Sequence, residues 1–357
     1  MRNATAWQQE HPLVLNDLQS IADDAVIPWA QLAGTRILVT GATGLIGTLL
    51  VKALLYYADS RKISYTVVAL TRSREKGLSC FAAFAPHMQQ GLLEIAEGDV
   101  QQPLPETLVA DYILHAASVT ASAEMVSNPV GTIMTTLDGT RHILELARRC
   151  NSRSCLFLSS MEVYGCLENE WVQESDSGYL NLATVRNCYP LSKRLAENLC
   201  VAYHSQHGVH VKTARLTLTF GPGIPKSDNR VFAQFARSVL EGKDIVMHTA
   251  GTTKRDYLYT ADAVRALLTI LLLGEDAEAY NVSDPDSYVT IRELAEITQC
   301  FNPAVKVIIH ADPEQAKKYA GEVHINLDNT KLNALNPFPR THVREMVGRL
   351  LAYMRSW

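Results

Sequence analysis

The glycine-rich stretch after residue 40 constrains the fold of this chain more than any other feature. A short apolar run, Arg36-Ile-Leu-Val-Thr40, leads into Gly41, Gly44 and Gly47, and apolar residues at helical spacing follow. This order predicts a strand, a tight turn and a helix start, the context of a dinucleotide-binding turn. We expect Gly41 to form the turn, Gly44 to let backbone approach a pyrophosphate, and Gly47 to let the helix pack closely. The helix N-terminus would then face the phosphates.

Strand-like and helix-like segments alternate along the following residues. The strand-like runs are 37–40, 66–70, 92–96, 112–115, 155–159 and 211–216, and helical patterns occur at 45–57, 130–150 and 190–207. Such alternation predicts an α/β fold, a Rossmann-type doubly wound parallel sheet that binds ligands at the carboxyl ends of its strands. We assign residues 34–220, and about 256–284, to this dinucleotide-binding domain. The less regular ranges 221–255 and 285–357 predict a smaller, discontinuous α/β substrate-binding cap, with helices at 230–241 and 291–300.

Residues 1–33 precede the first predicted strand and form a helical extension. Asp17, Leu18, Ile21, Ala22 and Val26 follow the spacing of a short amphipathic helix, and Pro28 and Trp29 come after it. We expect this helix to pack on the surface of the domain.

Composition excludes several classes of function. The 357 residues carry a net charge of −4, which gives no electrostatic reason for a nucleic acid or an anionic membrane as partner. No apolar window reaches the length of a membrane span. Seven scattered cysteines form no Cys-x-x-Cys pair, so neither a metal site nor a disulfide framework is indicated. A reducing, cytoplasmic location is the simplest setting.

Tyr189 and Lys193 are the first candidate catalytic pair. Their spacing of four places both side chains on one face of the predicted helix at 190–207. The pKa of a tyrosine is near 10, so a phenol acts as a base at neutral pH only when a cation stabilises its phenolate. We expect Lys193 to do so.

Polar residues follow the predicted strand at 155–159, where a doubly wound sheet binds its ligands. Ser160 can hydrogen-bond a substrate hydroxyl, and Glu162 can act as a base. Between them stands Met161, whose thioether donates no proton.

These motifs together resemble the extended short-chain dehydrogenase/reductase superfamily, in its NAD-dependent nucleotide-sugar epimerase/dehydratase branch. The resemblance runs from Arg36 to about Asn336. In chain order it rests on the glycine run, Gly98-Asp99-Val100, His115-Ala-Ala-Ser118, Ser160-Met-Glu-Val-Tyr-Gly165, Tyr189-x-x-x-Lys193, Phe220-Gly-Pro-Gly223 and Arg255-Asp-Tyr-Leu-Tyr-Thr-Ala-Asp262.

The resemblance implies an enzyme that acts on a nucleoside-diphosphate sugar through a transient 4-keto sugar. Tyr189 would take the proton of the 4-hydroxyl, Ser160 would hold the same oxygen, and Lys193 would also bind the cofactor ribose. Asp99 would meet the adenine and Arg255 the substrate diphosphate. The implied cofactor-binding residues are Gly41, Thr43, Gly44, Leu45, Ile46, Gly47, Asp99, Val100, His115, Ala116, Ala117, Ser118 and Lys193. A homodimer through the helices near 132–150 and 190–207 is also implied.

Within this branch the pattern is closest to UDP-glucuronate decarboxylases. An acid at Glu162 is similar to both decarboxylases and 4,6-dehydratases, but Met161 replaces the aspartate that many dehydratases use to protonate the departing hydroxyl. The segment Asp228-Asn-Arg230-Val-Phe also resembles the decarboxylases and implies that Arg230 faces the nucleotide sugar. Leu218, Gly223 and Thr136 depart from the family pattern. We rank decarboxylation first, 4,6-dehydration second and epimerisation third, with a keto-sugar reductase and a non-catalytic dinucleotide sensor as further alternatives.

The form of the cofactor is left open by the end of the second predicted strand. Thr71-Arg72-Ser73 stands where an acid would hold the ribose 2′-hydroxyl of NAD. Arg72 and Ser73 could instead accommodate the 2′-phosphate of NADP, whereas similarity to the decarboxylases favours tightly bound, recycled NAD.

Overall fold

The computed structural model describes residues 4–310 and 323–357, and its centre is a seven-stranded sheet. The parts of the predicted extension and cap at 1–3 and 311–322 lie outside these residues. The sheet comprises β1 (Arg36–Thr40), β2 (Thr66–Thr71), β3 (Leu93–Glu97), β4 (Tyr112–His115), β5 (Ser154–Ser160), β7 (Val211–Leu216) and β12 (Ala279–Val282). Its order is β12-β7-β5-β4-β1-β2-β3, and every neighbouring pair is parallel. The predicted Rossmann-type fold and all six predicted strands are confirmed, and β12 adds a seventh.

The strand order reverses between β1 and β4, and this positions the site. These strands are neighbours in register, with Val39 opposite Leu114 and Thr40 opposite His115. Both are buried along nearly their whole length, as expected for a parallel sheet that is covered on both faces. The connections after β1 and β4 leave toward opposite faces, so a crevice opens at the carboxyl ends of these two strands.

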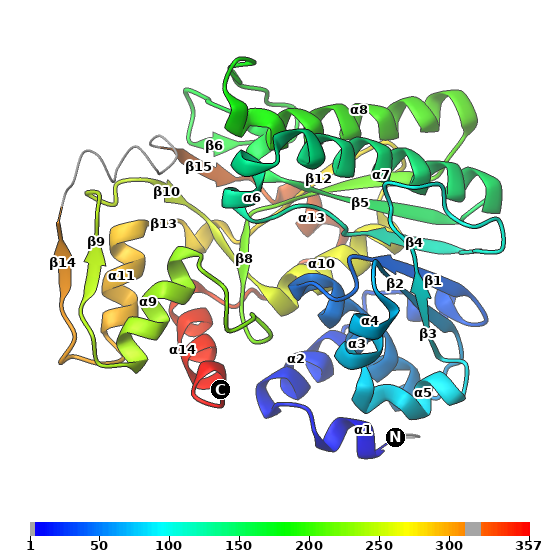
Figure 1. The fold of residues 1–357 in the computed structure, drawn as a ribbon, viewed down its shortest axis with the longest axis horizontal. Coiled ribbons are helices and arrows are strands. Elements are labelled where there is room, and N and C mark those ends of the chain that lie inside the picture. Colours follow the sequence, from blue (N-terminus) through cyan, green and yellow to red (C-terminus); the bar gives the residue numbers. More distant parts are fainter. Residues whose placement is uncertain (1–3, 311–322) are drawn as a thin grey trace.

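Helices cover both faces of the sheet (Figure 1). The helices α7 (Pro129–Cys150) and α8 (Cys188–His207) pack together on one face. On the other face lie α3 (Leu45–Arg61) and α10 (Thr260–Leu273). Shorter elements flank this core: α4 (Arg74–Cys80), η2 (Ala82–Phe84), α5 (Ala85–Gln89), α6 (Ser122–Ser127), η3 (Met161–Tyr164) and η4 (Val185–Asn187).

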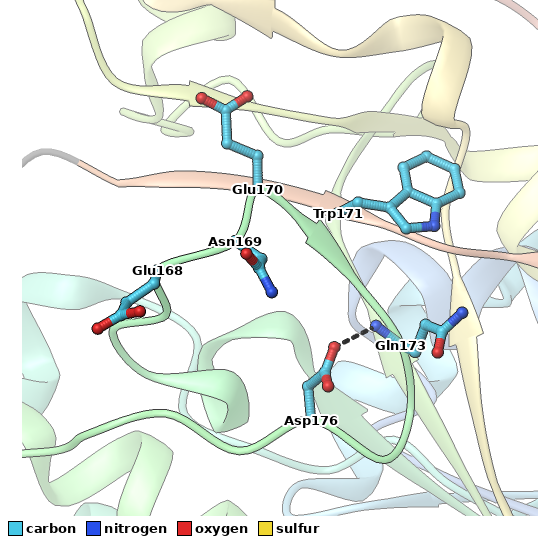
Figure 2. Close-up of a pocket in the computed structure, with 6 residues that line it drawn as sticks. All are labelled: Glu168, Asn169, Glu170, Trp171, Gln173 and Asp176. Carbon is cyan, nitrogen blue, oxygen red and sulfur yellow. Dashed lines mark hydrogen bonds between the residues drawn. The ribbon is translucent and has the colours of Figure 1, made fainter.

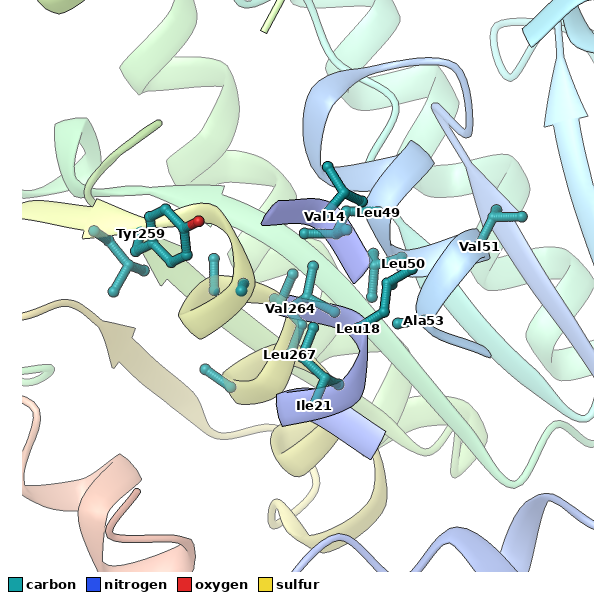
Figure 3. Close-up of a cluster of buried hydrophobic side chains, with 14 of the residues drawn as sticks. Val14, Leu18, Ile21, Leu49, Leu50, Val51, Ala53, Tyr259, Val264 and Leu267 are labelled. Carbon is teal, nitrogen blue, oxygen red and sulfur yellow. The ribbon is translucent and has the colours of Figure 1, made fainter. Parts of the chain in front are cut away.

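The N-terminal extension adds α1 (Ala4–Gln8), α2 (Pro12–Ala22) and η1 (Trp29–Leu32). Leu18 and Ile21 of α2 are fully buried against α3 and α10, as Figure 3 shows. The extension is therefore part of the core rather than a surface addition. The predicted helix was too long, because Val26 lies beyond its end and is 45% exposed. There the Asp24 carboxylate accepts a hydrogen bond from the Val26 N–H (2.9 Å), a turn that ends the helical path.

A buried carboxylate of α2 joins the extension to the C-terminal helix α14 (Val343–Met354). Asp17 accepts hydrogen bonds from the Tyr259 hydroxyl (2.7 Å) and from Nη2 of Arg349 (2.5 Å). Burial raises the pKa of Asp17 to about 6, although Tyr259 and Arg349 oppose the shift. The contact links the two ends of the chain through the core.

A second buried carboxylate holds α1. Asp59 of α3 accepts a hydrogen bond from the Trp7 indole (2.8 Å), and Nε2 of His87 lies 2.9 Å from the same oxygen. The Trp7 ring also packs edge-on against Phe84. These contacts bind α1 to the Rossmann core.

A smaller α/β region lies beside the sheet (Figure 1). Its helices are α9 (Val231–Leu240), α11 (Ile291–Gln299) and α14, with η5 (Pro285–Ser287). Its strands are β6 (Trp171–Val172), β8 (Leu218–Phe220), β9 (Ile245–Met247), β10 (Lys254–Arg255), β11 (Tyr257–Tyr259), β13 (Val289–Thr290), β14 (Val307–Ile309) and β15 (His324–Leu327).

Several elements differ from the assigned ranges. The strands β8 and β11 fall within 34–220 and 256–284, yet they pair with each other outside the seven-stranded sheet. The strand β6 falls within 34–220, yet it pairs with β15 in the sheet β13-β10-β15-β6. The helix α13 (Thr330–Leu335) falls within 285–357, yet it packs against α10 and β12. In the described part of the chain, no helix combines the length and apolar character needed to cross a membrane.

Candidate functional site

The glycine turn after β1 has room only for glycine at two of its three positions. Gly41 has φ +64°, and a Cβ there would lie 2.8 Å from the carbonyl oxygen of Ala116. A Cβ on Gly47 would lie 2.2 Å from the Gly41 oxygen, which is a clash. A Cβ on Gly44 would meet the same oxygen at 3.2 Å. Gly41 and Gly47 are therefore required by the fold, whereas Gly44 keeps the exposed edge of the turn free of a side chain.

The turn leaves the N-terminus of α3 open to the crevice. Gly44 is the N-cap residue of this 17-residue helix and offers no side chain to its first N–H groups. The next residues along the turn, Thr43, Leu45 and Ile46, are partly exposed around it. Free N–H groups at a helix start bind phosphate, so this end fits the predicted dinucleotide.

The ends of β1 and β4 are locked together beside this turn. The Thr40 hydroxyl lies 2.8 Å from Nδ1 of His115 and accepts a hydrogen bond from the Ala117 N–H (3.1 Å). His115 is buried, and this burial lowers its pKa to about 3, with Lys193 adding to the shift. Its Nε2 has no hydrogen-bond partner among the described residues. The predicted residues Ala116, Ala117 and Ser118 thus continue the wall of the crevice opposite the glycine turn.

The three predicted residues at the end of β2, Thr71, Arg72 and Ser73, have different surroundings. Thr71 and Ser73 are bonded within the turn, and the Ser73 hydroxyl caps α4 by accepting from the Lys76 N–H (3.2 Å). Arg72 is exposed and donates no hydrogen bond to any described residue. The neighbouring Arg74 is bonded to the Ile95 carbonyl (2.7 Å). Arg72 is therefore the cation available to a ligand at this strand end.

The residues after β3 form a rigid turn. The Asp99 carboxylate accepts a hydrogen bond from the Gln101 N–H (2.9 Å). Val100 is buried against Gly139, where a Cβ would lie 3.0 Å from it. Asp99 is thereby fixed near the carboxyl end of β3.

Two predicted residues, Ser160 and Ser118, meet the phenol of a third, Tyr189, at the carboxyl end of β5. Tyr189 lies in the first turn of α8 and is 7% exposed. Its hydroxyl shares hydrogen bonds with the hydroxyls of Ser160 and Ser118. The structure therefore brings together the proposed base, the proposed substrate-holding serine and a residue of the proposed cofactor site. A substrate hydroxyl at this point would meet Tyr189 and Ser160 at once.

The ionisation of this phenol differs from the sequence-based expectation. Burial, followed by the charge of Glu162, raises the pKa of Tyr189 to about 12, although the two serines lower it. Lys193 donates to the Leu158 carbonyl (2.7 Å) and lies 5.8 Å from the Tyr189 ring centre. Burial lowers the pKa of Lys193 to about 8. Burial therefore raises the pKa of Tyr189, and the groups that oppose the shift are Ser160, Arg186 and Ser118 rather than the expected Lys193.

Glu162 is paired with an arginine that the sequence patterns did not identify. Nη2 of Arg186, in η4, donates to Oε1 of Glu162 (3.0 Å). Beside it Met161 is buried, and its sulfur contacts the Thr217 hydroxyl (3.3 Å). Position 161 therefore supplies no proton donor to the site. No motif links residues 24 apart, so only the fold reveals the Arg186 contact.

Arg194 fixes the segment that carries Glu162, and it too was not identified. It follows Lys193 on α8 and donates to the carbonyls of Val163 (2.5 Å), Tyr164 (3.1 Å) and Gly178 (2.7 Å). One guanidinium thus joins the helix of Tyr189 to η3. The sequence signal was its position next to Lys193, which shows only that it lies on the same helix.

The two arginines proposed for the substrate have unlike surroundings. Arg230 is bound by the Asp228 carboxylate, with Nη2 2.6 Å from Oδ2, and it lies over the Phe232 ring. Arg255 in β10 has a buried Nε that has no partner among the described residues. Unpartnered buried atoms also occur nearby in sequence, at Nδ1 of His248 and the Tyr257 hydroxyl. Buried polar groups normally have partners, so the region of Arg255 fits a missing anionic ligand.

Two open hollows elsewhere do not suit a nucleotide. The first, shown in Figure 2, has a volume of about 540 Å³ and is lined by Glu168, Asn169, Glu170, Trp171, Gln173 and Asp176. Its three carboxylates would repel a diphosphate. The second, about 820 Å³, lies along the outer side of α8 and β12 and contains none of the predicted site residues. The crevice at the strand ends is the better site on chemical grounds.

Comparisons with known proteins agree with this geometry. Residues 37–283 match the family described as "NAD dependent epimerase/dehydratase family". The chain is 33% identical to UDP-glucuronic acid decarboxylase 5 of Arabidopsis thaliana, over 79% of this chain and 80% of the relative. It is 31% identical to UDP-glucuronic acid decarboxylase 1 of Danio rerio, over 73% and 59% respectively.

Solved structures share the fold. A UDP-N-acetylglucosamine 4-epimerase from Methanobrevibacter ruminantium superposes with TM-score 0.75 at 20% identity, covering 91% of this chain and 99% of the other. The dTDP-glucose 4,6-dehydratase DesIV from Streptomyces venezuelae, solved with NAD bound, superposes with TM-score 0.73 at 23% identity, covering 90% and 97%. The chain therefore belongs to the NAD-dependent epimerase/dehydratase family of enzymes.

Proposed function

We propose that this chain decarboxylates a UDP-linked hexuronate through a transient 4-keto sugar. The observation that carries the proposal is the hydrogen-bonded set of Tyr189, Ser160 and Ser118 at the strand ends, next to the glycine turn. A 4-hydroxyl bound there would give its proton to the phenolate form of Tyr189 while Ser160 holds the oxygen. When bound, the nicotinamide supplies reversible acceptance of the C4 hydride. The glycine turn, Asp99 and the His115–Ser118 wall would hold the dinucleotide.

The residues around Glu162 favour loss of CO₂ over dehydration. A 4-ketone accepts the electrons of the C5–C6 bond, so the carboxylate of a 4-keto uronate leaves without a proton donor. Elimination of a C6 hydroxyl needs an acid, and the buried thioether of Met161 cannot supply one. The similarity to UDP-glucuronic acid decarboxylases supports the same reaction.

A 4,6-dehydratase is the second candidate, because Glu162 is the kind of base that such a reaction uses at C5. One incubation separates the two. The protein, loaded with NAD, is mixed with UDP-glucuronate or with UDP-glucose. Decarboxylation predicts CO₂ and a UDP-pentose from the first, with no net NADH. A stable 4-keto-6-deoxy sugar from UDP-glucose, without CO₂ from UDP-glucuronate, would establish the dehydratase instead.

We also propose a homodimer in which α7 and α8 pair with those of a second copy. These helices expose apolar side chains, including Val130 (69%), Leu195 (54%) and Val201 (44%). Exposed apolar residues grouped on neighbouring helices are typical of protein interfaces. Light scattering of the purified chain measures the mass directly. The seven free cysteines support a reducing compartment.

The division of the chain into a dinucleotide-binding domain (34–220 and 256–284) and a cap (221–255 and 285–357) remains part of this proposal. Placement of β12 in the large sheet supports it. The pairing of β6 with β15 indicates that the cap also takes up residues 171–172.

A further inference from the structure

The Glu162–Arg186 ion pair stands at the accessible side of the catalytic phenol. Glu162 comes from η3 after β5, and Arg186 comes from η4 just before α8. Their side chains are 36% and 28% exposed, so solvent and ligands reach both. The pair thus lines the approach to Tyr189 rather than lying in the core.

Both charges act on Tyr189. Glu162 lies in η3, two residues after Ser160, and Arg186 lies in η4, three residues before Tyr189, so the pair lies beside the phenol. The Glu162 carboxylate raises the pKa of Tyr189 and the Arg186 guanidinium lowers it. In a hexuronate the carboxylate carbon is C6, which lies two bonds from C4. With the 4-hydroxyl at Tyr189 and Ser160, the C6 carboxylate would therefore come within reach of the neighbouring Glu162–Arg186 pair.

A hexuronate would bring a second carboxylate next to Glu162. Two carboxylates in one site repel each other, and a cation between them removes the repulsion. A guanidinium has five N–H donors in a planar fork, which suits two carboxylates at once. Glu162 is the only described residue to which Arg186 donates a hydrogen bond, so its other donors remain available.

The other cations near the phenol are already engaged. Lys193 is buried and bonded to the Leu158 carbonyl. Arg194 donates to three backbone carbonyls. Among the described cations, only Arg186 combines nearness to Tyr189, exposure and spare donors.

We infer that Arg186 is the specificity-determining residue that binds the C6 carboxylate of a nucleotide-linked hexuronate while it holds Glu162. The inference rests on the proposed function and adds the residue that selects an acidic sugar. A neutral C6 hydroxymethyl group needs no such cation. Arg186 therefore contributes to the binding of UDP-glucuronate and little to that of UDP-glucose.

The test is a comparison of two sugars that differ only at C6. Calorimetry measures the Kd of UDP-glucuronate and of UDP-glucose with NAD-loaded protein, in a Tyr189→Phe background that prevents turnover. Arg186→Gln should weaken UDP-glucuronate by about 30-fold or more, as expected when one partner of a charge pair is removed, and change UDP-glucose by less than about threefold. Arg186→Lys should restore part of the difference because it keeps the charge. Arg292→Gln, which removes an exposed pairing with Glu296 (2.9 Å) on α11, is the matched control.

Each result decides between the inference and the proposed function. An equal loss for both sugars, or no loss for either, overturns the role of Arg186, and CO₂ release by the unsubstituted protein would then still support decarboxylation. A selective loss without any CO₂ release supports Arg186 as the carboxylate-binding residue and overturns the decarboxylase. Equal affinity of the parent protein for both sugars overturns the role of Arg186 at the outset.

Discussion

Buried polar groups occur both at the N-terminal extension and in the crevice at the strand ends, but their hydrogen bonding differs. In the extension, Asp17 of α2 accepts hydrogen bonds from two residues on other elements, and Trp7 of α1 donates to the buried Asp59 of α3, which His87 also contacts. In the crevice, Nε2 of His115 and the hydroxyl of Ser159 have no partner among the described residues. Paired buried groups hold elements in place, whereas the unpaired groups at these strand ends remain available to a ligand. Substitutions should therefore change stability in the first region and activity in the second.

The largest effect is expected at Tyr189. Removing its hydroxyl in Tyr189→Phe should lower turnover of UDP-glucuronate by about 10³-fold or more, because general acid–base catalysis is lost. The free energy of unfolding should change by less than about 1 kcal/mol, since only hydrogen bonds with two serines disappear. CO₂ release and urea unfolding measure the two quantities. Turnover above a tenth of the parent value would show that Tyr189 is not the proton-transfer group.

A large pH effect is expected from Asp256, which is fully buried. Its Oδ1 accepts from the Thr217 hydroxyl (2.8 Å), and its Oδ2 has no described partner. Burial raises its pKa from 3.8 to about 7. Because the folded-state pKa is the higher one, the protonated acid stabilises the fold at low pH. That stability, about 4 kcal/mol, is lost as the pH rises from about 4 to about 7.

Asp256→Asn cannot ionise and isolates this contribution. Urea unfolding of both proteins between pH 4.5 and 8 should show the parent losing stability relative to the variant as the pH rises. Parallel curves would mean that the pKa of Asp256 is the same in the folded and the unfolded protein.

In the extension, Arg349→Met should destabilise the fold by about 3 kcal/mol, because it leaves the buried Asp17 carboxylate with Tyr259 alone. Turnover at saturating substrate should stay within twofold. The exposed Arg344 on the same helix is the control, and Arg344→Met should change unfolding little. A loss of turnover that exceeds the loss of folded protein would contradict the separation of the two regions.

The smallest effect is expected at the exposed Arg72. If it binds a 2′-phosphate, Arg72→Ser should weaken NADP about tenfold and leave NAD within twofold, since an exposed charge contributes on the order of 1 kcal/mol. Fluorescence titration with both cofactors measures this, with Lys76→Ser on the adjoining helix as control. Equal changes for NAD and NADP would remove Arg72 from the 2′ site.

Local patterns were sufficient for much of the fold. The six predicted strands depend on short apolar runs, and Gly47 is required by the backbone of Gly41 within the same turn, whereas Gly41 also meets Ala116 beyond the end of β4. Val26 was misplaced because apolar spacing alone does not reveal the Asp24 turn that ends the helix before it. The spacing of four residues on one helix also predicted that Tyr189 and Lys193 lie together. It could not predict how strongly burial would shift their pKa values.

Contacts between distant segments were beyond the sequence patterns. Arg186 meets Glu162 and Arg194 meets Val163 only because α8 packs against the end of β5. Their residue types are common on any helix surface, so no spacing rule distinguishes them. The contacts of Asp17 join residues that are even further apart in the sequence. The sequence therefore predicted a helix in the extension but not that this helix lies in the core.

The contacts of Asp17 also order events during synthesis. Its partners Tyr259 and Arg349 lie 242 and 332 residues later in the chain. Almost the whole polypeptide must leave the ribosome before both can be reached, and closing so long a loop is slow. The hydrogen bonds of Asp17 can therefore form only after β11 and α14 have been synthesised, although α2 can pack against α3 much earlier.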